Sequence, residues 1–406
     1  MSAIGGIFDI SGKEIDYSLL DRMRMAMSIR AGRQGTAYLG GSVGMLFGNA
    51  RSCRIREADT SQPAIFERKG EIYSLTFDSD TLSGESLFEG YRVYGVDFLG
   101  RLYADFALAL YDGERKMLLL ARDKRGSKPL FYRIYKGKLY YASEVKGLYA
   151  ATGDSISVCR ELLSLHISAP MGVYRAANLM TDVNEVLPGE CVLFTSLGMS
   201  RFRYRDSESR RPRARSFSER RIVIPSAYQS KQSIREILSS ALLCFDYPQF
   251  DADMPALTEL LERAANEERD SLFFEDITRS KSIPYSLERE DRLGALYGVS
   301  AIGVRSKDIA CAADSKNKIY RSLLSLILSL DSSQRAILLD VLGRQKLDFL
   351  MRRFESCAES IGSGEKKDTD AEIRILGMLY QTVLWAESRE LCIKQSSLCQ
   401  SALSMI

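Results

Sequence analysis

The chain has 406 residues, a length that predicts two domains rather than one core. Its composition, 45% hydrophobic and 27% charged, is that of soluble globular domains, and its net charge of +3 provides no electrostatic basis for binding nucleic acid or a membrane surface. No apolar run reaches the roughly 18 to 20 residues that a transmembrane helix needs.

The cysteines and the single histidine limit the chemistry. The eight cysteines are scattered without Cys-x-x-Cys spacing, and the first residues lack the basic start and cleavage site of a signal peptide. We therefore expect free thiols and a cytoplasmic protein. The single histidine, His166, excludes His-rich metal sites and argues against a Ser-His-Asp triad. Because it lies in a mixed apolar stretch, we expect its side chain to be structural.

The first 150 residues mostly contain the alternating or continuous apolar runs of β-strands. A helix is predicted at residues 19–29, with Asp16 or Ser18 as its cap, and another at residues 85–94. The pair Lys136-Gly137 predicts the turn of a β-hairpin. A further strand is expected at 191–195, and the predicted strands before it are 4–10, 43–48, 71–77, 106–111, 117–121, 130–135 and 138–142.

The second half has a different pattern. Residues 201–221 contain nine arginines among Ser, Pro and Glu and lack periodicity, which predicts an exposed linker; a basic patch for an acidic partner is the alternative. From residue 233 apolar residues recur every three or four positions, as in helices. The predicted domains are 1–205 and 233–406, joined by an arginine-rich linker at 206–232, and the predicted helices are 234–243, 256–265, 319–330, 336–354 and 372–391.

Several segments of residues 1–205 resemble motifs of the asparagine synthetases, which are class II glutamine amidotransferases. Residues 3–9 (Ala-Ile-Gly-Gly-Ile-Phe-Asp) resemble the family's start, and residues 105–112 its Met-Phe-Ala-Phe-Ala-Leu-Trp-Asp strand; the others are 122–132, 142–148 and 186–189. The resemblance implies an α+β fold. Residues 1–205 would form an Ntn-hydrolase-like (N-terminal nucleophile) αββα sandwich, and residues 233–406 a mostly α-helical, truncated remnant of the synthetase domain.

The nucleophile position is altered relative to this family. Its members cleave glutamine with an N-terminal cysteine, exposed by loss of the initiator methionine, whose α-amino group acts as the base. Ser2 stands at the matching position. Serine is less acidic than cysteine, so the amine must do more to activate it. Ser2 is either an inert residue at a lost site, which we favour, or a serine nucleophile.

The residues that match the oxyanion hole are also altered. The family's asparagine, in Asn-Gly-Glu-Ile-Tyr-Asn, has two candidate matches here. One is Lys69, followed by Gly-Glu-Ile-Tyr-Ser; the other is Asp78, followed by Ser79 and Asp80, which fits the strand spacing better. Neither retains the asparagine donor, and loss of such a donor lowers the rate ~100- to 1000-fold.

The remaining pocket residues match in part. Arg51 stands where the family has its pocket arginine, and a guanidinium there could bind a substrate carboxylate; a surface role is the alternative. The family's Arg-Gly-Pro-Asp loop begins here with Arg30 but lacks the proline and the aspartate. The aspartate that holds the substrate ammonium is absent from residues 83–86, where Glu85, displaced by one position, is the candidate replacement.

We expect no cofactor and no metal. The family uses ATP and Mg, but its Ser-Gly-Gly-x-Asp-Ser phosphate loop is absent. The spacing of a calcium loop is not found among the acidic residues Asp246, Asp251, Asp253 and Glu259. Asp253 is better interpreted as a helix cap.

Altered site residues on a retained scaffold predict a catalytically degenerate member of the family. It would act as a binding or partner subunit in amide-forming or peptide-modifying biosynthesis, paired with an intact synthetase, with an enzyme of the lasso-peptide cyclase type or with a second copy of itself. Two alternatives stay open: a serine-nucleophile amidohydrolase acting on glutamine or a related amide, and a divergent ATP- and glutamine-dependent amide synthetase. Whether the chain is an enzyme is therefore open.

Overall fold

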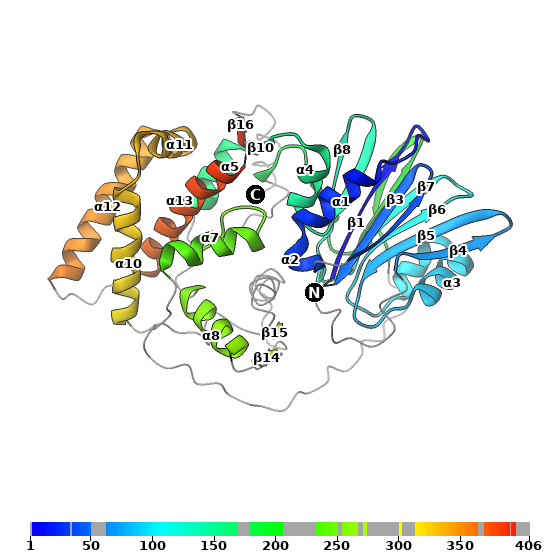
Figure 1. Cartoon of the computed structure of the whole chain (residues 1–406), viewed down its shortest axis with the longest axis horizontal. Helices are drawn as coiled ribbons and strands as arrows, with labels where there is room; N and C mark the ends of the chain where they lie inside the picture. Colours follow the sequence, from blue (N-terminus) through cyan, green and yellow to red (C-terminus); the bar gives the residue numbers. More distant parts are fainter. Residues whose placement is uncertain are drawn as a thin grey trace. The chain divides into compact units, whose positions relative to one another are not determined.

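The computed structural model describes residues 2–32, 35–49, 62–168, 179–205, 233–250, 254–266, 271–273, 300–302, 313–363, 369–389 and 391–394. The chain divides into two compact units (Figure 1). The first comprises Met1–Asp154, Asp182–Ser218 and Ile277–Glu288, and the second Ser155–Thr181, Glu219–Asp276 and Arg289–Ile406. In the part of the chain that the structure describes, no single helix is long and apolar enough to cross a membrane.

The first unit contains two antiparallel sheets of six described strands each. One sheet has the order β11-β8-β9-β1-β3-β2 and consists of β1 (Ser2–Asp9), β2 (Gly35–Gly40), β3 (Val43–Asn49), β8 (Phe131–Tyr135), β9 (Lys138–Ala142) and β11 (Asn184–Glu185). The other has the order β13-β12-β7-β6-β5-β4 and consists of β4 (Ala64–Arg68), β5 (Glu71–Asp78), β6 (Ala107–Asp112), β7 (Met117–Arg122), β12 (Glu190–Thr195) and β13 (Gly198–Arg203).

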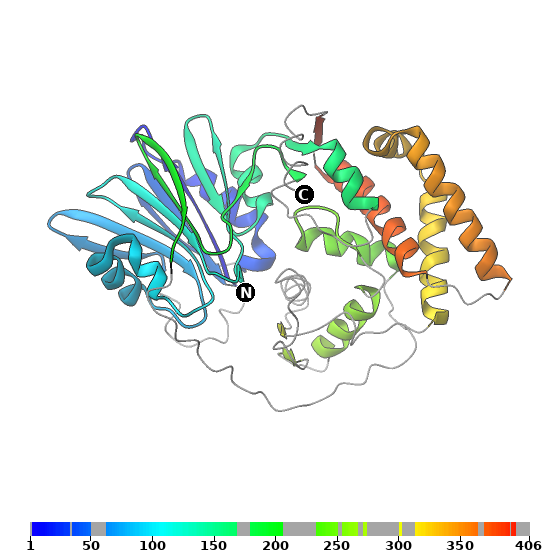
Figure 2. The same ribbon diagram turned by 180° about the vertical axis from the view of Figure 1, so that it is seen from behind.

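Helices cover the outer faces of these sheets (Figures 1 and 2). The helices α1 (Tyr17–Ala26), α2 (Ser28–Ala31) and α4 (Val145–Thr152) contact the first sheet. On the second sheet, α3 (Gly84–Tyr94) and the 3₁₀ helix η2 (Gly95–Arg101) contribute side chains to one hydrophobic cluster. Another cluster fills the space between the sheets. This is the predicted αββα sandwich, and the fold prediction is confirmed.

The local signals read from the sequence form the expected structures. Asp16 caps α1 by accepting a hydrogen bond from the backbone N–H of Ser18. Lys136 and Gly137 both have positive φ, 49° and 76°, as a tight hairpin turn between β8 and β9 requires.

The second unit is mostly helical. The long helix α13 (Asp370–Ser388) contacts several of its neighbours and buries Trp385. The other helices are α5 (Arg160–Ser168), α7 (Ile234–Cys244), α8 (Met254–Asn266), α10 (Ala313–Leu328), α11 (Ser332–Leu342) and α12 (Arg344–Gly362). Two short parallel pairs complete its described part: β10 (Ile156–Cys159) with β16 (Leu391–Lys394), and β14 (Ser271–Phe273) with β15 (Ser300–Ile302).

Two expectations need correction. The predicted helix at 336–354 is wrong, because the chain breaks between α11 and α12 at Gly343, whose φ of 77° does not continue a right-handed helix. Apolar spacing continues across this break, so periodicity alone did not reveal it. The expectation of free thiols throughout is also wrong, since Cys159 is disulfide-bonded, whereas Cys191, Cys244 and Cys357 are buried thiols. The predicted linker at 206–232 lies outside the described residues.

Candidate functional site

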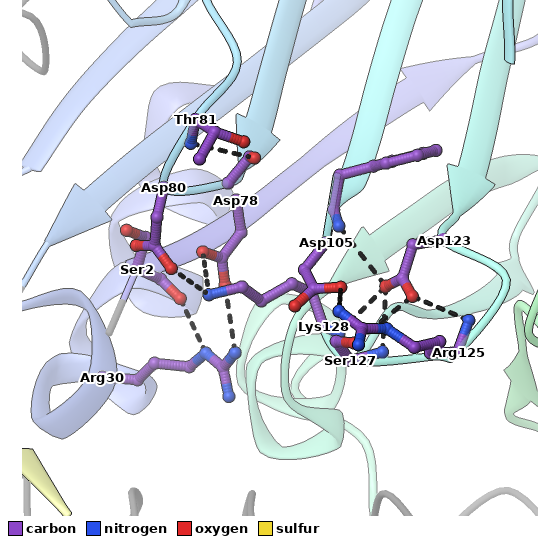
Figure 3. A network of polar contacts seen from close by, with 12 residues as sticks. Ser2, Arg30, Asp78, Asp80, Thr81, Asp105, Asp123, Arg125, Ser127 and Lys128 are labelled. Carbon is purple, nitrogen blue, oxygen red and sulfur yellow. Dashed lines mark hydrogen bonds and ion pairs between the residues drawn. The ribbon is translucent and has the colours of Figure 1, made fainter. Parts of the chain in front are cut away.

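Ser2 is held at the start of β1 by an arginine. Its backbone carbonyl accepts a 2.7 Å hydrogen bond from the Nε atom of Arg30 (Figure 3). Arg30 lies in α2, a short helix that packs against β1 and β3, and only 3% of its side chain is exposed. The position that matches the family nucleophile is therefore tied to a buried guanidinium.

The same guanidinium binds the carboxylate of Asp78 at the end of β5. The Oδ2 atom of Asp78 lies 3.1 Å from Nη2 of Arg30, and its Oδ1 atom lies 3.3 Å from Nζ of Lys128. Lys128 also lies 3.4 Å from the carboxylate of Asp80, which is exposed. Two cations from separate segments thus converge on one buried carboxylate beside Ser2 (Figure 3).

The charges of this network stabilise one another. Burial opposes ionisation of Asp78, but the charges of Lys128 and Arg30 outweigh it and lower the pKa of this carboxyl below its usual value. Burial similarly opposes the charge of Lys128, and the carboxylates of Asp78 and Asp80 outweigh it and raise the pKa of the lysine. At neutral pH, Asp78 is therefore a carboxylate that accepts hydrogen bonds and donates none.

The turn that carries Lys128 is built around Asp123. This buried carboxylate accepts hydrogen bonds from the backbone N–H groups of Arg125, Ser127 and Lys128, at 2.9, 2.9 and 3.4 Å (Figure 3). Gly126 takes a positive φ of 68° within the turn. The motif at residues 122–132 thus positions the ammonium that reaches Asp78.

The structure distinguishes the two candidate registers for the oxyanion segment. Lys69 and Gly70 have φ values of 53° and 80° and form the turn between β4 and β5. Asp78 is at the other end of β5, where Arg30 connects it with Ser2. The register that fits the strand spacing therefore places its residue, Asp78, next to the nucleophile position. Lys69, from the closer sequence match, lies at the other end of the strand.

The glutamine amidotransferase domain family matches residues 1–205, which is half of the chain. The chain belongs to the glutamine amidotransferase family. The relation to the asparagine synthetases that the motifs indicate is confirmed by glutamine-hydrolyzing asparagine synthetase 3 of Bacillus subtilis. That protein is 24% identical over 265 residues, which cover 60% of this chain and 42% of the relative.

The chain is also similar to a curated amidase and to an amidotransferase of solved structure. Amidase chyE of Penicillium rubens is 36% identical over 91 residues, 20% of this chain and 14% of that protein. Among solved structures, the glutamine phosphoribosylpyrophosphate amidotransferase of B. subtilis is 15% identical, with 59% of this chain and 57% of that chain covered at a TM-score of 0.35. The matches span less than half the length of the two curated relatives.

The other predicted pocket residues are less closely associated with the network of Arg30, Asp78 and Lys128. Ser79 follows Asp78 directly, is partly buried, and accepts a 3.4 Å hydrogen bond from the backbone of Thr81. Glu85 is exposed in the first turn of α3. Arg51 lies outside the described residues. Lys128 was not among the predicted site residues, and Arg30 was predicted only as a remnant of an altered loop, although a charged residue inside a retained scaffold motif was a usable signal.

The described residues also bear on the expectations for metal ligands and for His166. Within the described ranges, no group of three or more His, Cys, Asp or Glu side chains could hold a metal ion. Asp251 and Asp253 lie outside those ranges. His166, in the second unit, is buried, contacts the ring of Tyr247 edge-on and pairs through Nε2 with the carbonyl of Pro248 at 3.0 Å. Its role is structural, as predicted.

Proposed function

We propose that this chain is a catalytically degenerate glutamine amidotransferase that acts as a binding or partner subunit in amide-forming or peptide-modifying biosynthesis. The ion network of Asp78 carries this proposal. An oxyanion hole needs a hydrogen-bond donor where negative charge develops in the transition state. Asp78 presents an ionised carboxylate, which only accepts hydrogen bonds, at the position that matches the family's asparagine donor, so this side chain cannot donate to that oxyanion.

The surrounding residues support the same conclusion. Arg30 and Lys128 keep Asp78 ionised and limit its movement, so the carboxylate cannot readily become a neutral donor. Gly84, within the segment that matches the ammonium-binding motif, has no side chain, and the nearby Glu85 is exposed. Ser2 would have to act without the donor that binds the oxyanion and without the carboxylate that holds the substrate ammonium in the family reaction.

The retained parts of the domain are those that build the scaffold. Both sheets, the core between them and the turn around Asp123 are present. A folded domain without its catalytic groups is suited to binding a partner or a substrate. An intact synthetase, a peptide-modifying enzyme and a second copy of this chain are the partners consistent with this role.

Glutamate release from glutamine by the purified chain tests the proposal, with an intact mass to establish whether Met1 has been removed. We expect no release above background from the wild type and from Ser2→Ala. The double variant Ser2→Cys/Asp78→Asn, which supplies the family's nucleophile and donor, is the matched gain-of-function control. Release by the wild type that Ser2→Ala abolishes would overturn the proposal in favour of a serine-nucleophile amidohydrolase.

The synthetase alternative and the partner role need separate measurements. ATP-dependent amide formation by the chain alone would contradict the proposal and indicate a divergent synthetase. Light scattering of the purified chain distinguishes a dimer from a monomer, and titration with a glutamine-hydrolyzing asparagine synthetase tests binding to an intact relative. We expect the chain to bind a second copy of itself or the synthetase, and to release no glutamate in either case.

A further inference from the structure

Two described connections join the two units of the chain, and both begin at an aspartate of the first unit. The chain leaves the first unit after Asp154 and returns to it at Asp182, so residues 155–181 belong to the second unit. The side chains of these two aspartates are partly exposed, at 25% and 35%. The other boundaries between the units, at 218–219, 276–277 and 288–289, lie outside the described residues.

One buried arginine binds both aspartates. Arg133 lies on β8, and only 2% of its side chain is exposed. Its Nη1 and Nη2 atoms donate to the two carboxylate oxygens of Asp154 at 3.0 and 2.8 Å, and Nη2 also donates to Asp182. A guanidinium can serve two carboxylates because its five N–H groups diverge in a fixed, planar fork. The same side chain therefore holds the start of one connection and the end of the other.

Neighbouring groups fix the position of this guanidinium. It lies over the rings of Tyr149 and Tyr135, 4.4 and 4.9 Å from their centroids. The hydroxyl of Tyr149 donates to Asp182, and the hydroxyl of Thr152 accepts a 3.2 Å hydrogen bond from Arg133. All of these groups belong to the first unit, so the cluster is built without any residue of the second.

The two connections are also bonded to each other within the second unit. The backbone N–H of Thr181 donates to the carbonyl oxygen of Ser157 at 3.0 Å, and Val158 and Met180 form an antiparallel bridge. Thr181 directly precedes the second of the two aspartates, and Ser157 follows the first by three positions. The two connections therefore lie side by side and are held on both sides of the boundary.

We propose that this cluster, the Arg133 clamp of Arg133, Tyr149, Thr152, Asp154 and Asp182, makes the two connections a single hinge. Proteins open locally in contiguous cooperative segments, and hydrogen bonds between charged groups resist such opening more than neutral ones. Because one guanidinium serves both aspartates, a change at one of them alters the restraint on the other. The two connections should therefore open together. This hinge does not depend on the function proposed above.

Hydrogen exchange of the full chain, measured by mass spectrometry of its peptides, tests the hinge. Arg133→Met removes the guanidinium but keeps an apolar stem beside Tyr149. We expect exchange to become about tenfold faster in peptides that contain Ser157 and in peptides that contain Thr181, because the charged hydrogen bonds that restrain opening are lost. Unchanged exchange in these peptides would overturn the proposal.

The matched control is Arg201→Met. Arg201 also belongs to the first unit and binds one carboxylate, that of Glu190, through two hydrogen bonds of 2.9 and 3.0 Å. Its loss should leave exchange at both connections as in the wild type. If Arg201→Met accelerates them as much as Arg133→Met does, the effect is a general loosening of the first unit and the hinge is refuted.

Asp182→Asn distinguishes one hinge from two separate restraints. This side chain is partly exposed, so the substitution leaves the folded domain intact even if Arg133→Met does not fold. It directly weakens only the returning connection. We expect faster exchange in the Ser157 peptides as well as in the Thr181 peptides. An increase confined to the Thr181 peptides would show that the two connections open separately, which would contradict the proposal.

Discussion

The carboxylate of Asp78 lies 3.1 Å from the guanidinium of Arg30, and neither side chain is more than 3% exposed. Breaking such a pair by removing one partner leaves an uncompensated charge in a low-dielectric interior. Removal of Asp78 would also leave Lys128 without one of its two carboxylate partners. The stability of the first unit therefore depends on the same carboxylate on which the proposed loss of glutamine hydrolysis rests.

Replacing Asp78 by alanine should destabilise the fold strongly. We expect a loss of about 3–5 kcal/mol, the range found when one member of a buried ion pair is removed. Urea unfolding of the full chain, followed at several wavelengths because the chain has two units, measures it. The control Asp80→Ala removes an exposed carboxylate near the same lysine and should have little effect. Equal losses of stability for Asp78→Ala and Asp80→Ala would show that the buried ion pair contributes no more to stability than the exposed carboxylate.

His166 should make the stability of the chain fall in mild acid. Burial lowers its pKa to about 4, whereas an unfolded histidine ionises near pH 6.5. Between these values the unfolded state binds more protons, so the contribution is complete above pH 6.5 and is lost as the pH falls toward 4, by about 1.4 kcal/mol per unit.

The chain has one histidine, so the substitution His166→Gln removes this dependence entirely. The glutamine amide can still donate to the carbonyl of Pro248. Urea midpoints measured for both proteins from pH 7 to pH 4.5 should diverge, with the wild type showing the steeper decline. Parallel curves would mean that the imidazole is not held neutral in the folded protein.

Gly6 should not tolerate a side chain. A Cβ atom there would lie 2.4 Å from the backbone oxygen of Gly44 as well as from the hydroxyl of Tyr141, and a backbone atom of a central strand cannot easily move away. We expect Gly6→Ala to destabilise the protein by about 3 kcal/mol. At Gly362, the last residue of α12, a Cβ atom would meet nothing within 4 Å, so Gly362→Ala is the matched control. A thermal shift for Gly6→Ala as small as that of the control would contradict the close packing of β1.

Arg374 should stabilise the end of α5. Its guanidinium donates to the carbonyl oxygens of His166 and Ile167, at 2.9 and 3.1 Å, in the last turn of that helix. A cation at this end of a helix is favourable, and the two carbonyls would otherwise lack partners in a buried setting. We expect Arg374→Met to lower stability by about 2–3 kcal/mol. Arg352→Met, at an exposed arginine that bonds within its own helix, should leave the unfolding curve nearly unchanged.

Local patterns predicted most of the sandwich. Alternation along β5 and the positive-φ turn at Lys136 and Gly137 are properties of neighbouring residues, so they could be recognised without the fold. The break at Gly343 was missed because apolar spacing continues on both sides of it. The membership of α5 in the second unit also depends on contacts with α11 and α13, which are distant in the sequence.

The sequence by itself determined the scaffold, the absence of the family's asparagine at either candidate position, and the buried structural role of His166. Only the tertiary structure decided that Asp78, and not Lys69, lies next to Ser2, because the direction of β5 places these two residues at opposite ends of one strand. It also decided that Arg30 and Lys128 form ion pairs with the ionised carboxylate of Asp78. Charge pairing depends on distance through space, and these three residues come from a helix, a strand end and a turn that only folding brings together.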